Sequence, residues 1–236
     1  ACQGVARIHD HKLLHRDIKP ENLFIDHHHS VLVGDLGLAQ LQDAIGLADA
    51  AGSIPTMAPE VARIGARGQH PTTARVYSIA ADVYSLGATL FWMLSGTQPV
   101  PGASSFDDVW AARQPDVWDV APHVPQGLRD IVNKSIARDL AERYPSADAL
   151  DSALGGRSQA AREWTRVQPH NGHEQCFIGT KGSSCIEVCA IPTGVRTQLK
   201  VIAQHAGSRR AVRAAQRTVS RSGLPSALRS SFHSCN

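Results

Sequence analysis

The sequence predicts a mainly α-helical domain with short β-strands, followed by a small module that is β-rich or α+β. A long apolar stretch at residues 77–95, ended by Gly96, has the length of a buried helix. Two apolar triplets, at residues 23–25 and 31–33, flank a polar turn and favour a pair of short strands. After Gly156 the pattern changes to short apolar runs of strand length.

Charge divides the chain at the same place. Residues 1–155 contain 12 Lys and Arg against 18 Asp and Glu, whereas residues 156–236 contain 12 against 3. A change of sign on that scale predicts two units with different partners. We therefore expect a first domain at residues 1–155, a β-rich module at 156–204, and a basic tail at 205–236 whose composition predicts partial disorder.

Each predicted element has a local reason. The chain begins with helical spacing as far as residue 12, and then has the apolar pair 13–14, a polar loop at 15–22, the two strands, and a Gly-, Ala- and Asp-rich loop at 34–52. Ser146 is a good N-cap, and Gly155 and Gly156 are good stop signals for the helix that follows it. The remaining elements are expected as helices near 106–113, 126–137 and 146–154, and strands near 176–179, 186–191 and 198–202.

Composition narrows the class of protein. With 42% hydrophobic residues the chain can form a buried core, although aromatic residues make up only 5%. Five cysteines are an odd number, and Cys2 is far from the others, so a reducing, cytoplasmic environment is favoured over a disulfide framework. There is no signal-peptide pattern, and the apolar run at 83–94 is too short to span a bilayer. Because the chain begins with Ala1 instead of Met, we expect it to be a fragment.

Five short motifs follow one another in residues 1–155. They are HRDIKPEN at 15–22, DLG at 35–37, MAPE at 57–60, DVYSLG at 82–87 and AERY at 141–144. The first resembles the catalytic loop of protein kinases, and the others resemble the metal-binding, A-P-E, buried-helix and arginine motifs of that family. Residues 1–155 are therefore similar to the C-terminal lobe of a serine/threonine protein kinase.

The resemblance assigns chemistry to four residues. Phosphoryl transfer needs positioning and charge neutralisation, so Asp17 would accept and aim a substrate hydroxyl while Lys19 offsets charge on the γ-phosphate. Asn22 and Asp35 would hold Mg²⁺, because neutral and anionic oxygens suit a hard cation. The cofactors implied are ATP and Mg²⁺, with Lys19, Asn22 and Asp35 as the residues that contact them. Lys at position 19 is also typical of kinases that act on Ser and Thr.

Two residues of the following loop differ from the family pattern. Ser53 stands where the family usually has a Thr that contacts Asp17 and Lys19, and it keeps the hydroxyl. Thr56 replaces the usual Tyr of the substrate-binding segment, which leaves the peptide preference open.

Four more residues have structural or regulatory roles by resemblance. Glu60 and Arg143 would form a buried ion pair that anchors the loop, and Asp82 would hold the backbone of the catalytic loop. Arg16 is the position at which many kinases receive a phosphate from the activation loop. Residues 36–52 contain no Ser, Thr or Tyr, so we expect Asp43 or Asp49 to supply a fixed negative charge instead.

The upper lobe of a kinase is not apparent in this sequence. Only 14 residues precede His15, and they contain no glycine-rich loop and strand lysine. We therefore expect an upper lobe upstream in a longer chain, and no activity from residues 1–236 alone. The favoured function is transfer of the ATP γ-phosphate to Ser or Thr of a protein substrate. The alternative is a pseudokinase-like scaffold that binds partners without catalysis.

Residues outside the five motifs leave further alternatives open. A zinc site could be formed by His170, His173, Cys176, Cys185 and Cys189, although their spacing matches no common pattern and unliganded residues are the simpler interpretation. The run 27–29 is three histidines in a turn, where solvated side chains are the simpler interpretation than a metal site. The chain after Glu187 has eight Lys and Arg and no acid, which suits nucleic acid, an anionic membrane or a targeting role. Phe232 is its sole aromatic residue, so base stacking has little support.

Overall fold

The computed structural model describes residues 1–66, 75–156 and 162–236. The chain divides into two compact units, of which the first comprises 1–117 and 126–157 and the second comprises 118–125 and 158–236. The predicted boundary at residue 155 lies beside residues 157–161, which are outside the described part of the chain.

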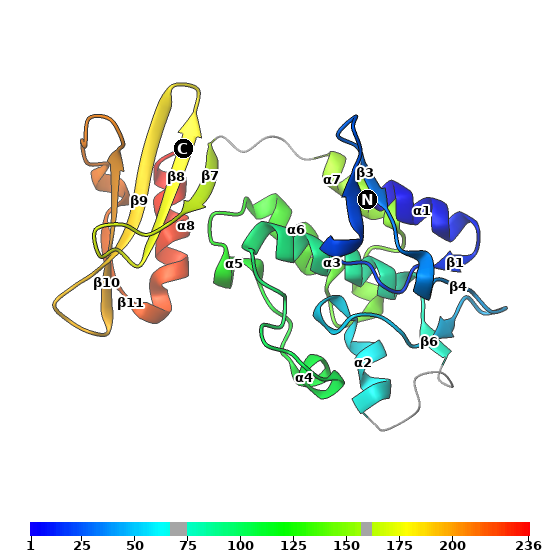
Figure 1. The fold of residues 1–236 in the computed structure, drawn as a ribbon. Helices are drawn as coiled ribbons and strands as arrows, with labels where there is room; N and C mark the ends of the chain where they lie inside the picture. The colour runs from blue at the N-terminus through cyan, green and yellow to red at the C-terminus, as the bar shows by residue number, and fades with distance from the viewer. Residues whose placement is uncertain (67–74, 157–161) are drawn as a thin grey trace. The chain divides into compact units, whose positions relative to one another are not determined.

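The first unit is mainly helical, as predicted (Figure 1). Its helices are α1 (Cys2–Asp10), α2 (Pro59–Ala66), α3 (Ile79–Ser95), α4 (Phe106–Ala111), α5 (Val117–Val120), α6 (Gln126–Ser135) and α7 (Ala147–Gly155). Helix α5 continues into the segment 118–125, which is grouped with the second unit. Its strands are β1 (Leu13–Leu14), β2 (Leu23–Ile25), β3 (Val31–Val33), β4 (Gln40–Leu41), β5 (Ala48–Asp49) and β6 (Arg75–Tyr77).

The predicted hairpin and helix ends are confirmed. Strands β2 and β3 pair antiparallel, with Leu23 opposite Val33. Helix α3 ends at Gly96, which has a φ of 74° and so adopts the left-handed conformation that favours glycine. Helix α7 begins after Ser146, whose side chain accepts a hydrogen bond from the Ala149 amide at 3.1 Å.

Helix α3 is buried along most of its length, because nearly every residue from Ala81 to Thr89 is apolar or small. Gly87 lets α6 approach closely, since a Cβ there would lie 2.3 Å from that of Ser135. Val5 of α1, Leu86 of α3 and Ile131 of α6 lie in one core cluster. This packed core supports the segment between α1 and α3, which contains three of the five motifs, and the fourth motif lies in α3 itself.

The second unit contains a five-stranded antiparallel meander in the order β11-β10-β9-β8-β7. Its elements are β7 (Glu163–Val167), β8 (Gln175–Lys181), β9 (Ser184–Pro192), β10 (Gln198–His205), β11 (Arg217–Ser220) and α8 (Leu224–Ser234). Helix α8 covers one face of the sheet (Figure 1), where Phe232 lies with its ring centroid 5.1 Å from that of Phe177. Val188, Val201 and Leu228 are fully buried in the same core.

Three sequence-based expectations differ from the structure. The tail at 205–236 is not an unstructured extension, because β11 completes the sheet and α8 buries Leu224, Leu228 and Phe232 against it. The loop at 34–52 contains two strands, β4 and β5, which pair with β1 and β6. Tyr77 belongs to β6 and not to the long helix, which begins after Ser78.

Across the described residues, no helix combines the length and the apolar character needed to cross a membrane.

Candidate active site

Asp82 of α3 fixes the backbone at the start of the loop at residues 15–22. Its carboxylate, which is fully buried, accepts hydrogen bonds from the backbone amides of His15 at 2.9 Å and Arg16 at 3.0 Å. The Tyr77 hydroxyl donates to it at 3.0 Å, and His9 Nε2 lies 2.9 Å away. Arg16 has a φ of 69°, an unfavourable conformation for its side chain, so these bonds hold the loop in a shape that it would not adopt alone. The role that the sequence suggested for Asp82 agrees with this geometry.

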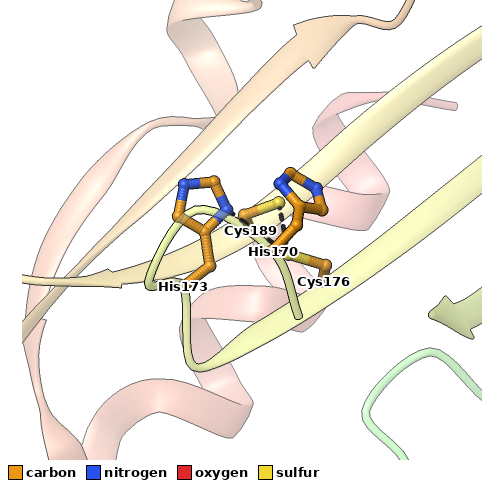
Figure 2. Close-up of side chains that lie close together, drawn as sticks. All are labelled: His170, His173, Cys176 and Cys189. Atoms are coloured by element: carbon orange, nitrogen blue, oxygen red, sulfur yellow. Dashed lines mark hydrogen bonds between the residues drawn. The ribbon is translucent and has the colours of Figure 1, made fainter. Parts of the chain in front are cut away.

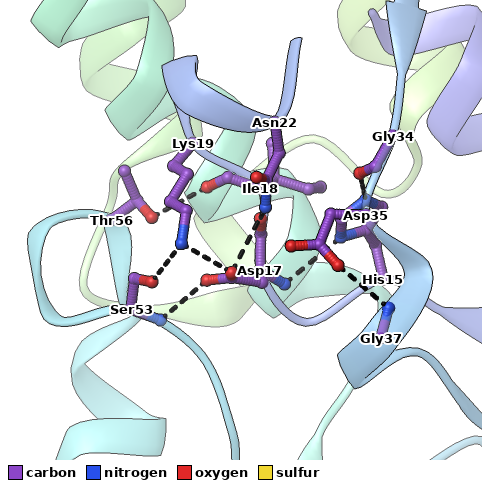
Figure 3. A network of polar contacts seen from close by, with 10 residues as sticks. All are labelled: His15, Asp17, Ile18, Lys19, Asn22, Gly34, Asp35, Gly37, Ser53 and Thr56. Carbon is purple, nitrogen blue, oxygen red and sulfur yellow. Dashed lines mark hydrogen bonds and ion pairs between the residues drawn. The ribbon is translucent and has the colours of Figure 1, made fainter.

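Asp17 lies at the centre of a polar network above that support (Figure 3). One carboxylate oxygen accepts from the Ser53 amide at 3.0 Å. The other accepts from Lys19 Nζ at 2.7 Å and from Asn22 Nδ2 at 3.2 Å. Lys19 Nζ also donates to Ser53 Oγ at 2.8 Å. Four residues from two separate segments of the chain are therefore held within one hydrogen-bonded group.

The electrostatics of Asp17 favour the charged form. Burial acts to raise its pKa, but hydrogen bonds from Lys19, Ser53 and Asn22 outweigh burial and hold the pKa below its ordinary value. Asp17 is thus a carboxylate at neutral pH. Such a group accepts a hydrogen bond from a hydroxyl well, but it is a weak base, so positioning is the larger part of what it can supply.

Asp35 lies on the other side of the site. Its carboxylate is exposed, one oxygen accepts from the Gly37 amide at 3.2 Å, and its φ of 58° places the backbone in the left-handed region. Figure 3 shows the side chain extending toward the residues of the loop at 15–22. The Asn22 amide nitrogen donates to the Asp17 carbonyl at 2.8 Å, which leaves the Asn22 amide oxygen for another partner. An amide oxygen and a carboxylate fit Mg²⁺, which prefers oxygen ligands.

Gly52 brings Ser53 into position. A Cβ on Gly52 would lie 2.4 Å from the Arg16 carbonyl oxygen, and its φ is 120°. Only glycine therefore fits where this loop crosses the loop at 15–22. Thr56 follows, and its hydroxyl donates to the Ile18 carbonyl at 2.8 Å instead of facing solvent.

Glu60 and Arg143 form the ion pair that the sequence suggested. Arg143 donates from both terminal nitrogens to the two Glu60 oxygens, at 2.8 and 2.7 Å. The same guanidinium donates to the backbone carbonyls of Ala137 at 2.7 Å and Ala80 at 2.8 Å. The pair thus joins the start of α2 to α3 and to the segment that follows α6.

Arg16 contacts backbone carbonyls of the following loop. It donates to the Leu38 carbonyl at 2.6 Å and to the Asp49 carbonyl at 2.9 Å. Burial lowers the pKa of Arg16, and the nearby charge of Asp49 opposes that effect. The Asp43 carboxylate instead accepts from the amides of Ile45 and Leu47 within its own turn. Of the two acids expected to serve Arg16, Asp49 is therefore the one with an electrostatic effect on it.

Four supporting residues were not anticipated from the sequence. His9 and Tyr77 complete the shell of Asp82, and the Ser85 hydroxyl donates to the Thr56 carbonyl at 2.9 Å. The His15 ring lies 3.0 Å from the Gly34 carbonyl, just before Asp35. Polar residues inside apolar helices were the available signal for His9 and Ser85. Their partners are up to 73 residues away, so spacing could not identify them.

Comparison with known proteins agrees with this geometry. The protein kinase domain family matches residues 1–154. The serine/threonine-protein kinase PrkC of Bacillus subtilis is 30% identical over 157 residues, covering 64% of this chain and 23% of that protein. The serine/threonine-protein kinase PknB of Mycolicibacterium smegmatis is 33% identical over 160 residues, covering 65% of this chain and 24% of that protein. The chain thus spans about a quarter of the length of the curated relatives it matches, and over residues 1–154 it belongs to the protein kinase family.

Proposed function

We propose that this chain carries the catalytic loop of a serine/threonine protein kinase, which transfers the γ-phosphate of ATP to a Ser or Thr hydroxyl of a protein substrate. The observation that carries the proposal is the group formed by Asp17, Lys19 and Ser53, in which a carboxylate and an ammonium are joined 2.7 Å apart. An ordinary surface ion pair consists of two side chains that contact each other alone. Here Asp17 also accepts hydrogen bonds from Asn22 and from Ser53, a residue of a separate loop, and a pair that only stabilised the fold would not need these additional contacts.

Each residue would act by position and charge. Asp17 would accept a hydrogen bond from the substrate hydroxyl and aim its oxygen at the phosphorus. Lys19, whose ammonium lies beside Asp17, would offset the negative charge that develops on the transferred phosphoryl group. Asn22 and Asp35 would hold Mg²⁺, which bridges phosphate oxygens and neutralises their charge.

The rest of the ATP site is expected elsewhere. No glycine-rich loop and strand lysine precede His15, so we propose that an upper lobe, in a longer chain, contacts the α- and β-phosphates. None of the five cysteines, all of which lie in the described residues, forms a disulfide, and this supports our proposal of a reducing, cytoplasmic location. Binding of nucleic acid or an anionic membrane by the basic stretch after Glu187 stays a prediction, and two of its arginines, Arg209 and Arg221, already contact Glu187 and Glu174.

The experiment is phosphate transfer from radiolabelled ATP and Mg²⁺ to a generic basic protein. Residues 1–236 alone should give none, and a chain extended to include an upper lobe should be active. In the extended chain, Asp17→Ala should abolish transfer and leave nucleotide binding nearly intact. Asp35→Ala should abolish transfer and also remove the magnesium dependence of nucleotide binding.

The control is Asp26→Ala, because Asp26 shapes the turn between β2 and β3 and lies outside the polar network. This variant should keep its activity. An extended chain that binds nucleotide but transfers no phosphate would support the pseudokinase-like scaffold. Equal loss of nucleotide affinity in Asp17→Ala and Asp35→Ala would contradict the roles assigned to them.

A further inference from the structure

A cluster of four metal-ligating side chains lies in the second unit, remote in sequence from the motifs described above. It consists of His170, His173, Cys176 and Cys189 (Figure 2). One ligand atom of each residue lies within 4.8 Å of those of all the others. Donors from a loop and from two strands therefore meet at one point, and two nitrogens with two sulfurs are a donor set typical of tetrahedral zinc.

The strand register brings the two cysteines together. Cys176 of β8 pairs directly with Cys189 of β9, and their sulfurs are 2.8 Å apart. Because side chains alternate along a strand, both point away from the face where Phe177 and Val188 meet α8. The two cysteines are nevertheless buried, at 0% and 1% exposure. The face opposite α8 is therefore covered at this point.

The loop between β7 and β8 supplies the two histidines. Asn171 and Gly172 have φ values of 52° and 73°, and the His173 amide donates to the His170 carbonyl at 2.9 Å. This tight turn puts the two imidazole rings on the same side, with centroids 4.8 Å apart. His173 Nδ1 lies 3.4 Å from the Cys176 sulfur. Both histidines are half-buried, so they lie between the buried sulfurs and solvent.

A carboxylate orients one of the histidines. His170 Nε2 lies 2.5 Å from Glu187, a largely buried residue two positions before Cys189. Gln204 and Arg209 also donate to this carboxylate, at 2.8 and 3.2 Å. With the proton on Nε2, the lone pair is on Nδ1, which accepts a hydrogen bond from Asn171 Nδ2 at 3.2 Å, and zinc binding at Nδ1 would replace this hydrogen bond. Metal-binding histidines usually make this second contact to a carboxylate, whereas a histidine that only fills space does not need it.

We propose that His170, His173, Cys176 and Cys189 bind one zinc ion that fixes the loop between β7 and β8 to the sheet. Four protein ligands complete a tetrahedron and leave no open position, so the site is structural and not catalytic. Two sulfurs that each lie about 2.3 Å from zinc are about 3.8 Å apart, so binding separates this pair by about 1 Å. The stability gained from bound zinc matters most in a small unit, because its hydrophobic core alone provides limited stability.

Cys185 provides the matched control. It lies on the same strand and the same face as Cys189, four residues away and hence about 13 Å along the strand. It takes no part in the cluster. The histidines at 27–29 are exposed in the turn after β2 and could bind metal weakly, but they offer no sulfur.

The test uses the full chain under reducing conditions. Purified protein should contain one equivalent of zinc by elemental analysis. Replacement with Co²⁺ should give the visible d–d bands of a tetrahedral site together with sulfur-to-cobalt charge-transfer absorption, which the histidines at 27–29 cannot produce. Cys176→Ser and Cys189→Ser should lose both signals, whereas Cys185→Ser should keep them. Glu187→Gln should retain the site but weaken zinc affinity about 10- to 100-fold in chelator competition.

A second measurement covers variants that do not fold. In wild-type protein, at a urea concentration that gives alkylating reagent access to the buried thiols, zinc should slow alkylation of Cys176 and Cys189, whereas Cys185 should react equally with and without zinc, as read by peptide mass spectrometry. The proposal is overturned if no equivalent of zinc binds, if Cys185→Ser removes the cobalt signal as fully as Cys189→Ser, or if zinc leaves the reactivity of all three thiols unchanged.

Discussion

Replacing Arg143 by Met tests whether the ion pair with Glu60 holds the substrate-binding segment in place. The Arg143 side chain is fully buried and that of Glu60 is 11% exposed. Removing one partner of a buried pair costs about 3–5 kcal/mol, because the other charge stays buried without compensation. The carbonyls of Ala137 and Ala80 also lose a charged donor. Since Glu60 keeps some access to water, we expect Arg143→Met to lower the free energy of unfolding of the first unit by about 4 kcal/mol.

The assay should separate the two units. Hydrogen–deuterium exchange at increasing urea concentration, read on peptides from α2 and α3, reports the first unit, and peptides from β8 and β9 give an internal reference. Combining Glu60→Gln with Arg143→Met should cost less than the two single changes added together, because no buried charge is left unpaired.

Arg129→Met is the matched control. Arg129 pairs with Asp116, but both side chains are 29% exposed, so we expect about 1 kcal/mol or less. The reasoning fails if Arg143→Met costs no more than Arg129→Met, or if the double variant costs as much as the sum of the single variants.

Three further predictions concern the active site. Gly52→Ala should lower phosphate transfer by the extended chain about 100-fold, because Ser53 moves away from Asp17. The control is Gly46→Ala, since Gly46 also has a positive φ but a Cβ there would lie 3.7 Å from the nearest atom, and this variant should retain activity. Equal effects of the two changes would contradict this reasoning. Because the pKa of Asp17 is lowered on folding, its contribution to stability is present above its ordinary pKa of about 3.9 and is lost as pH falls through the folded value. The stability advantage of wild type over Asp17→Asn should thus be constant above about pH 5 and shrink in more acidic urea titrations, and an advantage that grows there would be the wrong sign. Phosphatase treatment should leave the activity of the extended chain unchanged, because Arg16 already donates hydrogen bonds to carbonyls of the following loop. If activity is lost and returns when Thr56 is phosphorylated, phosphorylation of Thr56 is what activates the kinase.

The sequence alone was sufficient for features that depend on neighbouring residues. The loop at 15–22, the hairpin of β2 and β3, the Ser146 N-cap and the Gly96 stop each follow from a few adjacent residues, and the structure has all of them. Asp17, Lys19 and Asn22 lie within six residues of one another, so one motif was enough to group them, and their catalytic roles, which the resemblance implies, stay a prediction.

The tertiary structure decided whatever depends on residues brought together from distant parts of the chain. Asp82 meets His9 across 73 residues, and that contact has no sequence period that could predict it. The tail after residue 204 looked unstructured because it is basic and serine-rich, yet β11 has a sheet edge to pair with and α8 a face to cover. The metal cluster shows the same division. The sequence offered five candidate ligands. The antiparallel register of β8 and β9 placed Cys176 opposite Cys189 and put Cys185 farther along the strand, opposite Thr180.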